Sequence, residues 1–245
     1  MDQDLEEAIK LIKESKYTVA FTGAGISVES GIPPFRGENG LWSKYNPEIL
    51  DLSYFYSHPL ASWKVIKEIF YDFFGEAKPN KAHLALAELE NKGILKSVVT
   101  QNIDNLHTEA GSKEVYEFHG NSRMLVCKNN HHFEASLFNL EDLPPKCTKC
   151  NETLKPDFIF FGEGIPELAY CKSFEAAEKA DVIIVIGSTG EVYPAANMPK
   201  QAKANGAKII EINPEKTLFS ESITDVFLQG KASDVMEKIL IGLKR

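Results

Sequence analysis

The sequence lacks the features that would place the protein in a membrane, outside the cell or on nucleic acid. No apolar run approaches the ~18–20 residues of a membrane-spanning helix. The acidic start of the chain has neither the basic region nor the apolar core of a signal peptide. With 27 basic and 35 acidic side chains and a formal net charge of −8, the chain has no general basic surface. We therefore expect a cytoplasmic protein with no membrane contact and no direct binding of nucleic acid.

Cysteine is also scarce, yet three of the four cysteines have the spacing of a metal site. Cys147 and Cys150 form a C-x-x-C pair, and Cys127 lies 20 residues before Cys147, as in a structural zinc ribbon. A ribbon has its fourth cysteine at position 130, where this chain has asparagine followed by two histidines. A Cys3His site with His131 is our first choice, only marginally ahead of His132, and an empty site stays open. Four protein ligands leave no place for water, so the zinc would be structural.

A redox role for the C-x-x-C pair is the alternative to a metal. The neighbouring proline, lysine and asparagine residues indicate a loop, whereas thiols are activated at helix N-termini. The fourth cysteine, Cys171, lies in a predicted helix, where we expect ordinary packing.

A glycine turn after the first predicted strand is the most informative segment. Residues 17–21 form an apolar, β-branched and aromatic run, and T-G-A-G-I-S follows. Gly23 and Gly25 allow a tight turn, and the amides of the turn and of the next helix would bind a phosphate. Such a turn also occurs without a ligand, so the glycines alone leave both interpretations open.

The segment after this turn departs from the dehydrogenase pattern. A dehydrogenase has an acidic residue about 20 positions beyond the glycines to hold the ribose, and here that position is Ser43. Two consecutive prolines at 33 and 34 stop any helix. Phe35 then offers an aromatic face and Arg36 a fork of donors, so we expect a loop over the nucleotide.

The remaining pattern predicts an α/β fold of one large domain, or of one domain with a small insertion. We expect the protein to be a monomer. Apolar strands are expected at 94–100, 158–161, 182–187 and 208–212, alternating with helices, which indicates a parallel sheet covered on both faces. Residues 38–78 are rich in aromatics and predict a lobe of short helices. Ligands of parallel sheets bind at the carboxyl ends of the strands, where small and amide residues recur. These residues are Gly23, Ala24, Gln101, Asn102, Gly187, Ser188 and Asn213.

A set of motifs in order along the chain resembles the sirtuins, a family of NAD-dependent protein lysine deacylases. The matching motifs are G-A-G-I-S at 23–27, S-G-I-P at 30–33, F-R-G at 35–37, T-Q-N-I-D at 100–104, H-G at 119–120, F-G-E at 161–163, G-S at 187–188 and V-Y-P-A-A at 192–196. The resemblance implies a Rossmann-like NAD-binding domain of residues 1–32, 81–119 and 158–245. It also implies a helical, cofactor-loop module at 33–80 and a zinc-ribbon module at 120–157, with an acyl-lysine protein or peptide in the cleft.

The resemblance also implies a reaction and the residues that perform it. The acyl oxygen attacks C1′ of the nicotinamide ribose, nicotinamide leaves, and the acyl group passes to ADP-ribose. His119, with a pKa near the ordinary ~6.5, would be the general base, and Asn102 would order the ribose and water. Asp104 and Ile103 would hold the carboxamide. The other cofactor-binding residues it implies are Gly23, Ala24, Gly25, Val28, Phe35, Arg36, Gln101, Gly187, Ser188, Thr189 and Asn213, and the substrate-binding residues are Phe161, Gly162, Glu163 and Glu191.

The chain departs from the family pattern in ways that bear on specificity. Pro34 replaces the usual Asp or Thr and predicts a stiffer loop, and Thr189 replaces a serine. Glu191 stands at a usually apolar position, where it would favour basic residues beside the target lysine or be a solvated carboxylate. The Tyr-x-x-Arg pair of sirtuins that remove succinyl or malonyl groups is absent from the S-W-K-V-I-K segment at 62–67. Acetyl is the leading acyl group, and longer apolar chains stay open.

Three alternatives to a deacylase are open at this point. A dehydrogenase would reduce NAD, whereas a deacylase releases nicotinamide. A zinc-ribbon protein that binds nucleic acid is disfavoured by the acidic charge. A mono-ADP-ribosyltransferase would cleave NAD at the same site, and only its product would differ.

Overall fold

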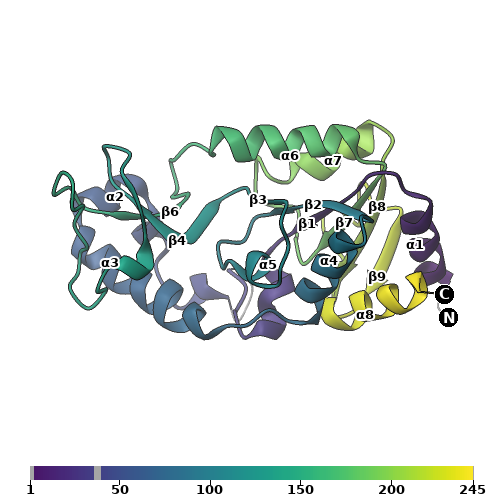
Figure 1. The fold of residues 1–245 in the computed structure, drawn as a ribbon, viewed down its shortest axis with the longest axis horizontal. Helices are drawn as coiled ribbons and strands as arrows, with labels where there is room; N and C mark the ends of the chain where they lie inside the picture. The colour runs from purple at the N-terminus through teal and green to yellow at the C-terminus, as the bar shows by residue number, and fades with distance from the viewer. Residues whose placement is uncertain (1–2, 36–39, 245) are drawn as a thin grey trace.

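A six-stranded parallel sheet forms the larger of two lobes (Figure 1). The structure is a computed structural model that describes residues 3–35 and 40–244. The strands run in the order β3-β2-β1-β7-β8-β9, and every neighbouring pair is parallel. Their bounds are β1 Thr18–Thr22, β2 Leu95–Thr100, β3 Val115–Glu117, β7 Val182–Ile186, β8 Lys208–Asn213 and β9 Val226–Gln229. The order of the strands reverses between β1 and β7, which is where ligands of such sheets bind.

Helices cover both faces of this sheet, as a parallel sheet with buried central strands requires (Figure 1). Helices α1 (Gln3–Glu14), α4 (Lys81–Asn91) and α8 (Ala232–Leu243) pack in one apolar cluster with one face. Helices α6 (Glu167–Lys179) and α7 (Asn197–Ala204) cover the other face. The 3₁₀ helix η1 (Ala24–Ser30) follows β1, and the short helix α5 (Leu106–Glu109) follows β2.

The smaller lobe combines short helices with a three-stranded antiparallel sheet of order β5-β4-β6. Its strands are β4 Gly120–Val126, β5 His132–Glu134 and β6 Lys155–Phe158. Its helices are η2 Leu41–Ser43, η3 Pro47–Leu50, α2 Leu52–Ser57, α3 Pro59–Lys67, the π-helix η4 Glu68–Phe73, η5 Phe74–Glu76 and η6 Ala135–Leu137. One apolar cluster contains both parts, and the Trp63 indole donates to the Leu154 carbonyl at 2.8 Å. The helices and the small sheet therefore share one core.

The strongest sequence patterns are confirmed by the fold. Leu5, Ala8, Ile9 and Ile12 recur at helical spacing in the sequence, and all four are buried on one face of α1. Asn80 caps α4 through the Ala82 and His83 amides, and Gly93 follows the helix in a left-handed conformation. The apolar runs near 95, 182 and 208 are strands of the large parallel sheet, and β1 lies between the first two.

Several sequence expectations are wrong. The 158–161 run does not join the parallel sheet, because only Phe158 lies in a strand and that strand pairs antiparallel with β4. An apolar run shows that a segment is buried but not in which sheet. Strands β3 and β9 were not expected, since β3 is three half-buried residues and β9 is four residues with exposed Gln229. Cys171 is exposed on α6, where we expected it to pack.

The helix that follows the glycine turn also differs from the expectation. It is a seven-residue 3₁₀ helix that ends at Gly31, which has a φ of 91°. A helix this short contributes little dipole, so a phosphate at the turn would rely on individual backbone amides.

Within the described ranges, no helix is both long enough and apolar enough to cross a membrane.

We expect Gly187→Ala to destabilise the fold. Gly187 has a φ of +62°, and a Cβ there would lie 2.3 Å from the Ile26 nitrogen and 2.5 Å from the Gly25 carbonyl carbon. Both contacts are to backbone, so the substitution should lower the free energy of unfolding by about 2 kcal/mol or more. Urea unfolding monitored by circular dichroism measures this change.

Gly164→Ala is the matched control, because a Cβ at Gly164 meets nothing within 4 Å. It should change the free energy of unfolding by less than about 1 kcal/mol. Equal losses in the two variants would contradict the claim that Gly187 is constrained by close backbone contact.

Candidate active site and metal centre

The loops after the four central strands meet at one edge of the large sheet. The Gly25 amide donates to the Gly187 carbonyl at 2.9 Å, which ties the loop after β1 to the loop after β7. Gln101, directly after β2, donates from its side chain to the Ser188 hydroxyl at 2.8 Å. Asn213, the last residue of β8, donates to the Ser188 carbonyl at 3.1 Å. The structure thus brings together the residues that sequence reasoning placed at four separate strand ends.

Glycine is required where these loops touch. A Cβ on Gly25 would lie 2.6 Å from the Gly187 Cα, and one on Gly23 would lie 2.8 Å from the Gly187 carbonyl oxygen. The two main chains therefore pass each other at a distance that no other residue permits. The result is a bare backbone cradle of the kind that accommodates the phosphates of a dinucleotide.

A buried polar cluster lies behind the cradle. Ser27 donates to Asp104 Oδ2 at 2.7 Å, and the Asn102 side-chain amide donates to the Ser27 hydroxyl at 3.2 Å and to the Gly23 carbonyl at 3.2 Å. Burial raises the pKa of Asp104, although the hydrogen bonds from Ser27 and from the Leu106 amide oppose the shift. Asn102 and Asp104 therefore occupy fixed positions, with their polar atoms held by neighbours from two strands.

Two histidines of this cluster were missed by sequence reasoning. His83 Nε2 lies 3.5 Å from the Ser27 hydroxyl, and His107 Nε2 lies 2.9 Å from the Thr22 hydroxyl. Burial lowers the pKa of His83 to about 4 and moves the pKa of His107 well below its ordinary value, so both are neutral at pH 7. The only sequence signal for His83 was a histidine among the inward apolar positions of the helix at 80–91.

His119 lies beside this cluster with one ring nitrogen engaged. Its Nδ1 is 3.0 Å from the Gln101 carbonyl oxygen, which can only accept, so Nδ1 carries the hydrogen and Nε2 is left as the acceptor. Burial lowers the pKa of His119, opposed by the hydrogen bond to Gln101. Our expectation of an ordinary pKa is therefore wrong. A neutral imidazole with Nε2 unprotonated is the form that a general base needs.

The other expected cofactor residues border the same edge. Ala24 and the exposed Val28 lie on η1, and Thr189 hydrogen-bonds Glu191 at 3.2 Å in the loop after β7. Phe35 packs against Trp42 and Phe70, with ring centroids 5.5 and 6.4 Å apart. Ile103 is buried and its carbonyl accepts from Ser122. Arg36 lies outside the described residues.

The expected substrate residues lie where the small lobe meets this edge. Phe161 is 51% exposed, which is unusual for its size, and its backbone exchanges two hydrogen bonds with Leu50 and Leu52. Gly162 follows with a φ of +85°. The Glu163 carboxylate accepts from the Phe160 amide at 2.9 Å and pairs with Lys155 at 3.0 Å, so it is engaged within the chain. Glu191 is exposed in its loop.

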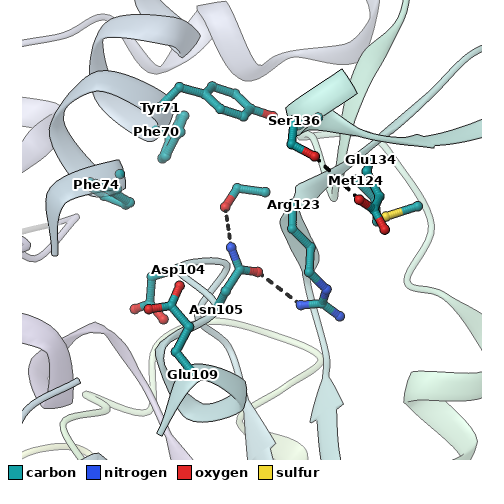
Figure 2. A pocket seen from close by; sticks show the side chains of 13 residues that line it. Phe70, Tyr71, Phe74, Asp104, Asn105, Glu109, Arg123, Met124, Glu134 and Ser136 are labelled. Carbon is teal, nitrogen blue, oxygen red and sulfur yellow. Dashed lines mark hydrogen bonds between the residues drawn. The ribbon is translucent and has the colours of Figure 1, made fainter. Parts of the chain in front are cut away.

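A cavity of about 480 Å³ lies on the small-lobe side of Asp104 (Figure 2). Phe70, Tyr71 and Phe74 form its aromatic side. Figure 2 shows Asn105 on the opposite side, where its amide donates to Ser122 at 3.0 Å and its oxygen accepts from Arg123 at 3.0 Å. Asp104 therefore both lines this cavity and accepts from Ser27 of the buried polar cluster.

Four potential metal ligands meet in the small lobe. Cys127, His131, Cys147 and Cys150 place their ligand atoms within 4.8 Å of one another. His131 Nδ1 lies 3.5 Å from Cys127 Sγ and 3.4 Å from Cys147 Sγ, and Cys127 Sγ lies 3.7 Å from Cys150 Sγ. Tetrahedral zinc with bonds of about 2.0–2.3 Å requires ligand atoms about 3.5–3.8 Å apart, which these three separations match.

His132 has other partners. Its Nδ1 lies 3.1 Å from Asp157 and its Nε2 lies 2.9 Å from the Asn130 side-chain oxygen. Asn130, at the position of a ribbon's usual cysteine, has a φ of 59°, a left-handed turn that asparagine tolerates. Hydrogen bonds from the Glu152 amide and the Asn129 side chain lower the pKa of Cys150 to about 6, which favours the thiolate that binds metal.

This fold and these sites define a Rossmann-like nucleotide-binding enzyme with a separate lobe that carries a cluster of four potential metal ligands. The model of the Sir2 family matches residues 23–194. The NAD-dependent protein deacylase of Thermococcus sibiricus is 45% identical over 98% of this chain and 97% of its own length. That of Pyrococcus furiosus is 44% identical over 98% of each. The chain belongs to the Sir2 family.

Solved structures agree with the family and show what its members bind. A mutant Sir2 homologue in complex with ADP-ribose has a TM-score of 0.93 and 42% identity, covering 100% of this chain and 97% of that one. A Sir2–p53 peptide–NAD+ complex has a TM-score of 0.89 and 36% identity, covering 97% of each chain. The chain is an NAD-dependent protein deacylase, and the names of its relatives do not favour a dehydrogenase or a mono-ADP-ribosyltransferase.

We expect His131→Ala to lower the zinc content and His132→Ala to leave it unchanged. His131 places Nδ1 within 3.5 Å of two cysteine sulfurs, whereas His132 pairs with Asp157. Elemental analysis of the dialysed proteins measures the ratio, with about one zinc per chain expected for the wild-type protein and for His132→Ala. Cys171→Ser serves as a cysteine control, since Cys171 is exposed on α6. Metal-free wild-type protein, or the same loss in both histidine variants, would contradict the cluster as a zinc site.

Proposed function

We propose that the chain removes acetyl and other uncharged acyl groups from protein lysines at the edge where the two lobes meet. The observation that carries the proposal is the position of His119. Its Nδ1 is hydrogen-bonded to the Gln101 carbonyl, which places it beside the strand-end cradle. Its own carbonyl accepts from the Ile159 amide at 2.9 Å, two residues before the exposed Phe161. A nucleotide in the cradle and a side chain passing Phe161 would therefore meet at one imidazole.

NAD fits the cradle by its chemistry. The close approach of Gly23, Gly25 and Gly187 presents backbone without side chains at the strand ends, where a pyrophosphate would lie, and Ser188 and Asn213 would hold the adenosine end. Asp104 and Ile103 would hold the carboxamide of nicotinamide, since the Asp104 carboxylate is fixed by Ser27 and the Leu106 amide and can accept from an amide N–H. Ala24, Val28, Phe35, Arg36, Gln101 and Thr189 complete the proposed cofactor-binding set.

His119 and Asn102 would perform the proton transfer and the ordering of the reactants. NAD supplies an ADP-ribosyl group that accepts the acyl group as nicotinamide departs. His119 Nε2 would take the proton of a ribose hydroxyl, because Nδ1 is committed to the Gln101 carbonyl. Asn102, held by Ser27 and Gly23, would orient the ribose and the water.

The acyl-lysine would enter past Phe161. An exposed phenylalanine beside Trp42, with ring centroids 6.5 Å apart, offers an apolar wall for the lysine stem. Gly162, Glu163 and the loop of Glu191 would border the peptide. Peptides with basic residues beside the target lysine would meet the exposed Glu191 carboxylate.

Uncharged acyl groups are favoured because α3 carries no arginine to pair with an acidic one, and of its two lysines Lys64 is exposed and Lys67 is paired. In that helix Trp63 is buried against Leu154, and Lys67 pairs with Asp72 at 2.8 Å and Glu141 at 3.0 Å. We therefore propose acetyl first and longer apolar chains second, with succinyl and malonyl groups disfavoured.

The remaining proposals concern organisation. We propose that the NAD-binding domain consists of residues 1–32, 81–119 and 158–245, with the helical module at 33–80 and the zinc-ribbon module at 120–157. The zinc would be structural, since the cluster supplies four protein ligands and leaves no open position. Reduced cysteines suit a cytoplasmic enzyme, and a monomer stays our prediction.

We expect the wild-type protein, given NAD and an acetylated peptide, to release nicotinamide and form O-acetyl-ADP-ribose and free lysine. His119→Ala should fold normally and lose about a hundredfold or more in rate, because the base that takes the ribose proton is gone. Mass spectrometry of peptide and nucleotide products measures both. ADP-ribose attached to protein in place of O-acetyl-ADP-ribose, or undiminished deacylation by His119→Ala, would refute the proposal.

We also expect the acidic limb of the pH profile to lie below the ordinary histidine value. Burial lowers the pKa of His119 from 6.5, so the imidazole stays neutral to a lower pH and the base is lost only on further acidification. The pH dependence of kcat/KM for the peptide, measured at constant ionic strength, reports the pKa of this base in the enzyme before the peptide binds. An acidic midpoint at or above 6.5 would show that the charged imidazole is not destabilised in the free protein.

A further inference from the structure

Lys155 is the one lysine of the described residues that is buried, and its side chain is only 3% exposed. It begins strand β6 of the small lobe. A buried ammonium is costly unless each of its three hydrogens has an acceptor. Lys155 meets this requirement, because Nζ donates to the carbonyls of Pro156 at 2.8 Å and Phe158 at 2.7 Å and pairs with Glu163 at 3.0 Å.

The acceptors lie in β6 and in the stretch of chain that follows it. Residues 158–163 turn around the ammonium, and Nζ lies 4.5 Å from the centroid of the Phe160 ring. Glu163 closes the turn, since its Oε2 also accepts from the Phe160 amide at 2.9 Å while its own amide donates to the Phe160 carbonyl at 3.0 Å. We call residues 158–163 with Lys155 the ammonium turn.

The ammonium turn is attached to both sides of the proposed site. The Ile159 amide donates to the His119 carbonyl at 2.9 Å, and the Phe161 amide donates to the Leu50 carbonyl at 2.8 Å. The turn thus spans from the main chain of the proposed base to the helices of the small lobe. The exposed Phe161 side chain is carried by the second of these attachments.

We propose that Lys155 is a positioning residue for the protein substrate, and that Glu163 acts mainly by holding Lys155 and the Phe160 amide. The pair fixes the ammonium turn so that Phe161 presents its ring to the acyl-lysine stem. The proposal rests on the proposed function, because it takes Phe161 as a wall of the acyl-lysine site. It revises the expectation that Glu163 is primarily a peptide-binding residue.

The alternatives for the pair are weaker on the same contacts. A lysine whose only role was to solubilise the surface would be exposed, as the other lysines of the described chain are in whole or part. A pair that only stabilised β6 would bond within the small sheet, whereas the charged partner of Nζ, Glu163, lies beyond the end of the strand and closes the turn.

The test compares steady-state kinetics of Lys155→Met and Lys155→Arg. Methionine keeps the apolar stem and removes the ammonium, leaving the two carbonyls and Glu163 without their donor. We expect the KM for an acetylated peptide to rise about tenfold or more in Lys155→Met, while the KM for NAD changes less than about twofold. Lys155→Arg keeps the charge and the donors, so it should recover most of the loss in peptide KM.

Lys92→Met is the matched control. Lys92 also pairs with a glutamate, Glu88, at 2.6 Å, but this pair is exposed on α4. Its loss should leave all kinetic constants unchanged. An unchanged peptide KM in Lys155→Met, an equal rise in the KM for NAD, or no recovery by Lys155→Arg would overturn the proposal.

Glu163→Gln keeps the test decisive if Lys155→Met does not fold. The amide still accepts from Phe160, but the charge that pairs with Lys155 is gone. It should raise the KM for the peptide and leave the KM for NAD within about twofold, because the ammonium turn loses the charge that holds Lys155. An unchanged KM for the peptide in Glu163→Gln would overturn the proposal.

Amide hydrogen exchange separates this proposal from the proposed function. Lys155→Met should accelerate exchange of the Phe160 and Phe161 amides about tenfold or more, while amides of β1 and β7 are unaffected. Absence of deacylation by the wild-type protein would refute the function and leave this readout intact. Unchanged exchange in the ammonium turn of an active enzyme would refute the role of Lys155.

Discussion

The contact on which the rest of the site depends is the close approach of two main chains beyond β1 and β7. The Gly25 amide bonds the Gly187 carbonyl, and a side chain at either position would overlap the other loop. Because these strands are parallel neighbours where the strand order reverses, their carboxyl ends form a crevice in the centre of the sheet. Gln101, Asn102 and Asn213 then bond to the carbonyls and hydroxyl of these loops rather than to each other, so the glycine contact sets where each of them stands.

The small lobe adds a second wall by joining two segments that are distant in sequence. The helices of 41–76 and the small sheet of 120–158 bury their aromatic and aliphatic side chains in one cluster. Trp63 illustrates the dependence, since its ring is fully buried and its indole bonds Leu154 from the other segment. The four-ligand cluster holds the far end of the small sheet, and the ammonium turn links its near end to His119. The lobe that carries the four potential metal ligands is thus connected to the lobe of the large sheet through backbone hydrogen bonds.

Much of the large lobe was predictable because its signals are local. Fully buried parallel strands appear as continuous apolar runs, so β1, β2, β7 and β8 were found, whereas the short edge strands β3 and β9 have too few apolar residues to stand out. The run at 158–161 was assigned to the wrong sheet because hydrophobicity reports burial and not the pairing partner. The lowered pKa of His119 could not be foreseen, since it comes from burial by distant segments.

The sequence by itself determined the order of the family motifs, the residue types at the strand ends, and a set of soft ligands with the spacing of a zinc ribbon. Only the tertiary structure decided which partner each group has. It placed His131 among the cysteines and His132 against Asp157. It also paired Glu163 with Lys155 and placed His83 beside Ser27, which is 56 residues away in the sequence. Propensity and periodicity act over a few residues, whereas burial and pairing depend on which remote segments pack together, and that choice is made by the fold as a whole.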